Sequence, residues 1–199
     1  SAPDIHDIDA TPTGYLSTVL DNQGNETATL VASGSNRVYV TIDEIPLDLQ
    51  HAFVAIEDAR FYEHNGIDIT GIVRAGITGI TSGRFSQGAS TITQQLLKNN
   101  VFTDWTSESS FADKMERKIQ EQYLAIQLEK VEDKDWILEN YLNTINLGQN
   151  TLGVQAASQR YFNKDVSELT LSECAVIAGI TQNPSRYNPV SNPDANAER

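Results

Sequence analysis

The sequence contains a single cysteine, Cys174, so the chain can form no internal disulfide bond. It has no apolar run long enough to span a bilayer as a helix, and no signal peptide is visible at its N-terminus. Cys174 lies in an apolar segment, and we expect it to be a small, buried core residue. These absences exclude a disulfide-stapled fold and a membrane span within this chain.

Basic residues are also few, because 14 lysines and arginines face 27 acidic residues and leave a net charge of −13. A surface of this sign repels phosphate backbones, so we predict no nucleic-acid partner. It also argues against docking on an anionic membrane by charge alone, so any membrane contact must be apolar and local. The 39% hydrophobic content is too high for a disordered chain, and 199 residues suffice for one domain with a sizeable core.

The residue pattern predicts a β segment followed by a mainly helical domain. Alternation and a turn signal predict strands over 15–20 and 27–31, with a third strand over 38–42. Helical spacing begins after Pro46 and recurs to the end of the chain. We expect two helices that start near residues 46 and 69. We expect further helices over 91–99, 111–130, 134–143, 154–162 and 171–179. We therefore divide the chain into a β segment and linker over 1–45, a main domain over 46–190, and the start of a further linker over 191–199.

The first stretch that indicates chemistry runs from Glu57 to Gly66 and reads EDARFYEHNG. Glu57 lies at the edge of an apolar helical stripe that includes Leu49 and Phe53, and Asp58 points nearly opposite. A carboxylate beside apolar groups is suited to act as a general base near neutral pH. On periodicity alone, an amphipathic helix with a glutamate at its solvent border explains this pattern better.

The second stretch, residues 87–99, reads QGASTITQQLLKN and combines a glycine loop with the start of a helix. Backbone N–H groups at a helix start can bind an anion. Thr91, Gln94, Gln95 and Lys98 share one helical face, which places hydroxyl, amide and amine groups together. An ordinary capped helix with a wet polar face would show a similar stripe.

A third stretch over 116–129 places Arg117 and Glu121 one helical turn apart. A surface ion pair of little energetic weight would have the same spacing. Together with 137–148 and 173–187, these stretches resemble, in order, the five motifs of the peptidoglycan glycosyltransferases, the family 51 domain of class A penicillin-binding proteins. The resemblance runs from about Pro46 to Pro189. Asn146 departs from the tyrosine often found at its position.

The resemblance implies a mainly α (α+β) fold, with a lysozyme-like helical lobe and a smaller, membrane-proximal jaw lobe. It implies polymerisation of lipid II into β-1,4-linked glycan strands, with inversion and release of undecaprenyl diphosphate, and inhibition by moenomycin. Its implied partners are lipid II, a lipid-linked glycan strand, the bacterial membrane through an apolar jaw, and a transpeptidase domain in the full-length chain. The implied location is the outer face of the cytoplasmic membrane, with an N-terminal transmembrane anchor outside this chain.

The resemblance also implies roles for individual residues. Glu57 would be the general base, and Glu121 would organise the diphosphate end, alone or through a divalent cation (Mg²⁺ or Mn²⁺). No organic cofactor is implied. The expected substrate-binding residues are Ser90, Thr91, Gln94, Gln95, Lys98, Asn99, Arg117, Asp58 and His64. Of these, we expect Asp58 and His64 to act mainly by holding the first motif's turn through hydrogen bonds.

Two alternatives from other functional classes remain open at this stage. A lysozyme-like hydrolase or lytic transglycosylase would also need a catalytic acid in a cleft, often with a second carboxylate. A non-catalytic cell-wall scaffold would be indifferent to Glu57. We further expect some of the aromatic residues that flank the second motif to dip into the membrane interface, the alternative being that they pack into the core. These aromatic residues are Phe85, Phe102, Trp105 and Phe111.

Overall fold

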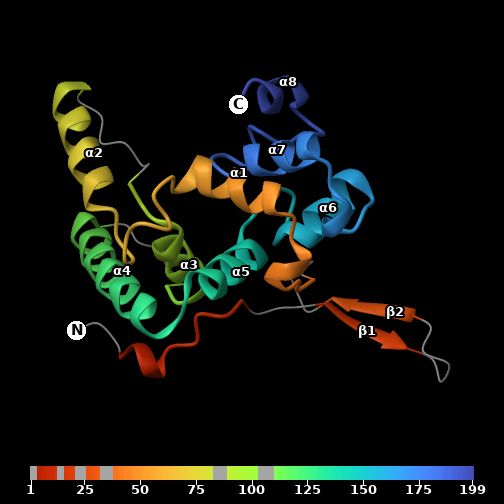
Figure 1. The fold of residues 1–199 in the computed structure, drawn as a ribbon, viewed down its shortest axis with the longest axis horizontal. Coiled ribbons are helices and arrows are strands. Elements are labelled where there is room, and N and C mark those ends of the chain that lie inside the picture. The colour runs from red at the N-terminus through yellow and green to blue at the C-terminus, as the bar shows by residue number, and fades with distance from the viewer. Residues whose placement is uncertain (1–3, 13–15, 21–25, 32–37, 83–88, 103–109) are drawn as a thin grey trace. The chain divides into compact units, whose positions relative to one another are not determined.

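The computed structural model describes residues 4–12, 16–20, 26–31, 38–82, 89–102 and 110–199, with side chains over 4–12, 38–77, 89–102 and 110–199. These residues are mainly helical (Figure 1), which confirms the predicted fold class. The helices are α1 (Leu47–Glu57), α2 (Ile69–Ser82), α3 (Ile92–Asn100), α4 (Phe111–Val131), α5 (Lys134–Thr144), α6 (Val154–Phe162), α7 (Leu171–Gly179) and α8 (Pro193–Ala197). Within the described ranges, no helix has the length and apolar character needed to cross a membrane.

The predicted hairpin is confirmed, because β1 (Leu16–Leu20) pairs antiparallel with β2 (Glu26–Val31). The third predicted strand is wrong, since residues 38–41 form no strand and Ile42–Glu44 form a 3₁₀ turn. A side chain takes the hydrogen bonds that a neighbouring strand would make. Val40 N–H donates to Asn143 Oδ1 at 2.9 Å, and Asn143 Nδ2 donates to the Val40 carbonyl oxygen at 2.8 Å.

Local sequence signals explain several element ends. Thr170 caps α7 in a reciprocal capping box with Glu173, as the sequence predicts. Gly148 and Gly153 have φ values of 90° and 83°, and they bracket the predicted turn between α5 and α6. At Gly153 a Cβ atom would lie 2.9 Å from the Asn143 carbonyl oxygen, so only glycine fits there.

Contacts group the chain into two compact units, Ser1–Thr11 with Phe53–Tyr141, and Pro12–Ala52 with Leu142–Arg199. In the first unit α3 packs against α4, around a core of Phe53, Phe61, Ile92, Leu96, Leu97, Leu124, Leu128 and Tyr141. In the second unit α7 packs against α6 and α8, around a core of Leu147, Val154, Ala157, Val166, Cys174 and Ile177. Burial raises the pKa of the Cys174 thiol to about 11, in keeping with an inert core residue. The predicted domain boundary at 45/46 stays a prediction.

Candidate active site

Glu57 is the last residue of α1 and belongs to the first unit. The helix is anchored by fully buried Phe53, whereas the Glu57 side chain is half-buried. Glu57 Oε2 accepts a hydrogen bond from Gln95 Nε2 of α3 at 3.3 Å. The first and second motifs therefore meet at this carboxylate. Arg60 lies beyond the end of α1 and pairs with Asp68.

Asp58 and His64 hold the segment after α1 through hydrogen bonds, as predicted. The buried Asp58 Oδ2 accepts from His64 Nε2 at 2.7 Å and from the Ile92 backbone N–H at 3.0 Å. His64 Nδ1 accepts from the Gly66 N–H at 3.1 Å, which leaves Nε2 as the ring nitrogen that donates to Asp58. Asp58 thereby ties the Glu57 segment to the first turn of α3.

Gly66 permits the close approach of this segment to α4. Its φ is 99°, and a Cβ atom there would lie 2.5 Å from the backbone of Ala125. The Gly66 carbonyl oxygen accepts from Thr91 Oγ1 at 2.7 Å. A larger residue at position 66 would push the first motif away from α4. The close contact with α4 therefore explains why the motif has glycine at this position.

The polar face predicted for α3 divides into an inner and an outer pair. Thr91 and Gln94 are buried and form the capping box of α3, and Gln94 Nε2 also donates to Glu121 Oε1 at 3.2 Å. Gln95 and Lys98 are half-buried instead. The inner pair uses its polar groups within the protein, so its binding role stays a prediction. Asn99 is likewise half-buried, in the last turn of α3.

Three cationic side chains gather around one buried carboxylate, that of Glu121, which is 1% exposed. Arg117 Nη1 lies 2.7 Å from Glu121 Oε2, and Lys118 Nζ lies 2.5 Å from Glu121 Oε1. Lys118 Nζ also donates to Ser90 Oγ at 2.7 Å.

The third cation of this group is Lys98. Burial lowers its pKa, and the positive charges of Lys118 and Arg117 lower it further, while Glu121 and Glu57 act in the opposite direction. Lys98, Arg117 and Lys118 thus bring three positive charges together near Glu121, and a local concentration of positive charge of this kind is suited to attract an anion. We call these three residues the cationic cluster.

Sequence reasoning missed Lys118 as a site residue. It lies three residues before Glu121, a spacing at which helical side chains meet, and that spacing was the available signal. The predicted Arg117–Glu121 contact is present, but it is not the exposed ion pair that the alternative interpretation expected.

A pocket of about 260 Å³ opens beside Glu57. Glu57 and Asp58 line it together with Ser90 and Thr91 from the start of α3. Arg60, Asp68 and Arg74 supply further charged groups, and small alanines make up much of the rest. The pocket therefore lies next to the candidate base and has polar walls that can bind hydroxyl groups.

The residues around Glu121 do not fit a divalent cation well. Both oxygens of Glu121 already accept hydrogen bonds from Arg117, Lys118 or Gln94. Among the residues that the structure describes, no group of three or more His, Cys, Asp or Glu side chains could hold a metal ion. A metal at Glu121 stays a prediction, and we derive no chemical step through one.

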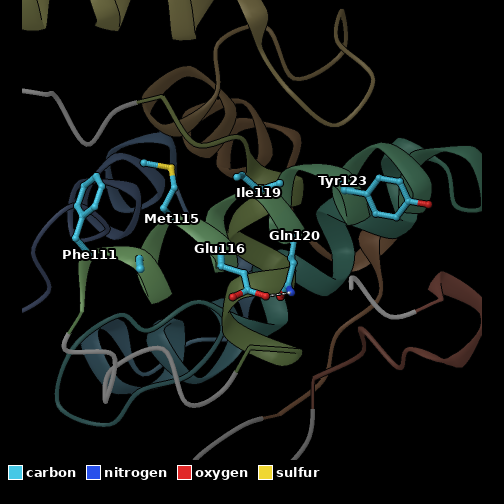
Figure 2. Close-up of a pocket in the computed structure, with 7 residues that line it drawn as sticks. Phe111, Met115, Glu116, Ile119, Gln120 and Tyr123 are labelled. Carbon is cyan, nitrogen blue, oxygen red and sulfur yellow. Dashed lines mark hydrogen bonds between the residues drawn. The ribbon is translucent and has the colours of Figure 1, made fainter.

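Two helices of the first unit expose apolar residues at four-residue intervals. On α4 these are Phe111, Met115, Ile119 and Tyr123, of which Phe111 is 78% and Ile119 60% exposed. Figure 2 shows these residues following one another along α4, where they line an open groove. Ile69, Val73 and Ile77 form a similar stripe on α2. Of the aromatic residues predicted to reach the membrane, Phe111 is exposed and Phe102 partly buried, while Phe85 and Trp105 lie outside the described residues.

Comparisons with known proteins identify relatives over most of the chain. A family model described as Transglycosylase matches residues 23–199. Penicillin-binding protein 1A of Clostridium perfringens (strain 13 / Type A) is 50% identical over 92% of this chain and 26% of its own length. Penicillin-binding protein 1F of Bacillus subtilis (strain 168) is 46% identical over 92% of this chain and 24% of its own length. Penicillin-binding protein 1A of Escherichia coli (strain K12) is 49% identical over 79% of this chain and 18% of its own length. The chain thus spans about a quarter or less of these relatives.

Proposed function

Because the chain belongs to the transglycosylase family, the glycosyltransferase domain of class A penicillin-binding proteins, we propose that it polymerises lipid II into peptidoglycan glycan strands. The observation that best supports this proposal is the cationic cluster in the same unit as Glu57. A diphosphate is the anion that such a cluster suits, and a carboxylate close by can serve as the base.

In the proposed reaction the 4-hydroxyl of lipid II's N-acetylglucosamine attacks the anomeric carbon of the lipid-linked strand. Glu57 takes the hydroxyl proton, a β-1,4 C–O bond forms, and the C–O bond to the diphosphate breaks. The bonding electrons leave with undecaprenyl diphosphate, whose growing negative charge the cationic cluster stabilises. Attack opposite the leaving group converts the α-linked donor into a β-linked product, so the configuration inverts without a covalent enzyme intermediate.

Glu121 organises the cationic cluster in this account. An ionised carboxylate accepts hydrogen bonds and donates none. The Glu121 carboxylate accepts from Arg117 and from Lys118 through separate oxygens, and it fixes both side chains. Fixed cations require little rearrangement when charge develops on the leaving group, which is where electrostatic catalysis gains most. We therefore assign Glu121 to charge organisation and Glu57 to proton transfer.

We expect Lys98→Ala and Arg117→Ala each to weaken moenomycin binding and to slow polymerisation. A hydrogen bond to a charged group contributes roughly 1.5–3 kcal/mol, so affinity should fall between about 10-fold and about 150-fold. Inhibitor binding measured by calorimetry checks this. Lys114→Ala is the matched control, because Lys114 is an exposed cation on the same helix as Arg117. Unchanged affinity in both site variants would remove these residues from the diphosphate site.

We also propose that the exposed stripes of α2 and α4 contact the outer face of the cytoplasmic membrane. Lipid II keeps its polyprenyl tail in the bilayer while its sugars enter the site, so the enzyme must work at the membrane surface. The net charge of −13 offers no attraction to anionic lipid. Large exposed apolar residues in a row, such as Phe111 and Ile119, suit insertion into the interface instead.

The double change Phe111→Ser with Ile119→Ser should weaken binding to neutral phosphatidylcholine vesicles, measured by co-flotation, by about 100-fold or more, because burying each large side chain in lipid contributes about 1.5–3 kcal/mol. Thermal stability should change little, since both residues are exposed. Leu171→Ser provides the control, because Leu171 is 68% exposed but lies on α7. Equal flotation of all three proteins would exclude this face of α4 as the membrane contact.

The structure gives little support to a hydrolase. Most glycoside hydrolases need two available carboxyl groups. Near Glu57, the Asp58 carboxylate is occupied by His64 and the α3 backbone, and the Glu121 carboxylate is occupied by cations. A scaffold function would not require the cationic cluster.

We further propose that the full-length protein carries a transpeptidase domain and an N-terminal membrane anchor, as expected for its class.

A further inference from the structure

A line of hydrogen bonds connects the core of the first unit to the candidate base. Tyr141 of α5 is fully buried, and its ring packs edge-on against Phe53, with centroids 6.2 Å apart and planes at 82°. The Tyr141 hydroxyl donates to Gln95 Oε1 at 3.5 Å. Gln95 Nε2 in turn donates to Glu57 Oε2 at 3.3 Å. The phenol thus reaches the carboxylate through a single amide.

The acceptor character of Glu57 determines the direction of this chain. An ionised carboxylate accepts hydrogen bonds only, so Gln95 must turn its amino group toward Glu57. Its carbonyl oxygen then faces Tyr141, and the phenol must be the donor. A Gln95 amide turned the other way would place its oxygen against the carboxylate and repel it.

We propose that Tyr141 is a positioning residue for proton transfer, which holds the Gln95 amide in the one orientation that aligns the Glu57 carboxylate with the acceptor hydroxyl. This inference rests on the proposed function, in which Glu57 is the base. The packed core around Tyr141 thereby restrains the half-buried carboxylate of Glu57. A carboxylate held in place loses less orientational freedom when it meets its substrate.

Tyr141 does not itself exchange the proton. Burial raises the pKa of its phenol well above the ordinary value, and the negative charges of Glu57 and Asp58 raise it further. The hydroxyl therefore remains protonated at physiological pH and continues to donate. Its role is to orient Gln95, and Tyr141 has no direct contact with the reacting sugar in this account.

Tyr141→Phe tests the proposal, because it removes the hydroxyl and keeps the ring against Phe53. We expect kcat to fall between about 10-fold and about 100-fold, the range seen when a catalytic group is slightly misplaced. KM for lipid II should stay within about twofold, since the lost contact does not bind substrate. Tyr161→Phe is the matched control: it removes a hydroxyl that donates to the Leu147 carbonyl oxygen at 2.6 Å in the second unit. It should lower Tm and leave kcat unchanged.

A double-mutant cycle separates positioning through Gln95 from a general packing effect. If Tyr141 acts through Gln95, adding Tyr141→Phe to Gln95→Ala should cause no further loss of kcat. Wild-type kcat in Tyr141→Phe would overturn the proposal. So would independent, multiplying effects of the two changes.

A second measurement does not depend on catalysis and distinguishes failure of this proposal from failure of the proposed function. The side-chain amide protons of Gln95, assigned by their loss in Gln95→Ala, should exchange slowly with water in the wild type and faster in Tyr141→Phe, as measured by ¹⁵N NMR. Equal exchange rates would overturn the positioning role even if Glu57 is the base. A wild-type chain that makes no polymer from lipid II would overturn the proposed function and leave the exchange result intact, whereas polymer from a Glu57→Gln variant would overturn only the assignment of Glu57 as the base.

Discussion

Glu57→Gln should give a folded protein that no longer polymerises lipid II. Glutamine keeps the shape of the side chain, and it cannot take the proton of the attacking hydroxyl. Loss of a general base slows a reaction by about 10² to 10⁴-fold, which removes detectable polymer in an end-point assay. Donor binding should persist, because the change keeps all three cations of the cluster that we propose as the diphosphate site.

Glu63→Gln is the matched control for this experiment. Glu63 belongs to the same motif but is exposed, so its loss should leave polymerisation and stability near the wild-type values. Polymer output is followed by gel electrophoresis of labelled glycan, and the fold by circular dichroism. A folded Glu57→Gln protein that makes polymer at close to the wild-type rate would disprove the assignment of the base.

Glu129→Gln should destabilise the chain by about 3 kcal/mol, because it breaks a buried charge pair by removing one partner. Glu129 accepts from Lys134 Nζ at 2.6 Å and from Thr93 Oγ1 at 2.6 Å, and its side chain is only 4% exposed. Lys134 Nζ also donates to the His64 carbonyl oxygen at 2.7 Å. The pair thereby fastens α4, α5 and the His64 segment together.

Removing one partner of a buried charge pair costs about 3–5 kcal/mol. We take the lower value because the Lys134 side chain is 24% exposed, so water can partly solvate the charge that is left unpaired. For a chain of this size the loss corresponds to a drop in Tm of roughly 6–12 °C. Glu116→Gln, an exposed change on the same helix, should stay within about 0.5 kcal/mol of the wild type. Urea unfolding of the three proteins measures the difference, and equal midpoints for Glu129→Gln and wild type would contradict a stabilising role for the pair.

Local signals in the sequence were sufficient to predict most helices and the hairpin. Capping residues such as Thr91 and Thr170 mark helix starts, and the apolar period predicted the rest. The third strand failed because local pattern cannot foresee Asn143, which binds Val40 from 103 positions along the chain. The end of α1 at Glu57 also depends on distant residues, since Asp58 is held by His64 and by the start of α3.

The site shows the same division between local and long-range information. The roles predicted for Glu57, Lys98 and Arg117 came from the resemblance of their motifs to those of the family, and these roles stay predictions. Lys118 and Tyr141 did not stand out, because their significance depends on the packing of α3 against α4 and on the path of α5 past Gln95. α4 is rich in charge along its whole length, and its sequence does not reveal that Glu121 is buried while Glu116 is exposed.

The most direct test of the central claim is incubation of this chain with labelled lipid II in neutral vesicles, beside its Glu57→Gln variant. We expect the wild-type chain to make polymeric glycan, moenomycin to abolish this product, and the variant to make none. A folded wild-type chain that makes no polymer, or that instead cleaves finished peptidoglycan, would contradict it.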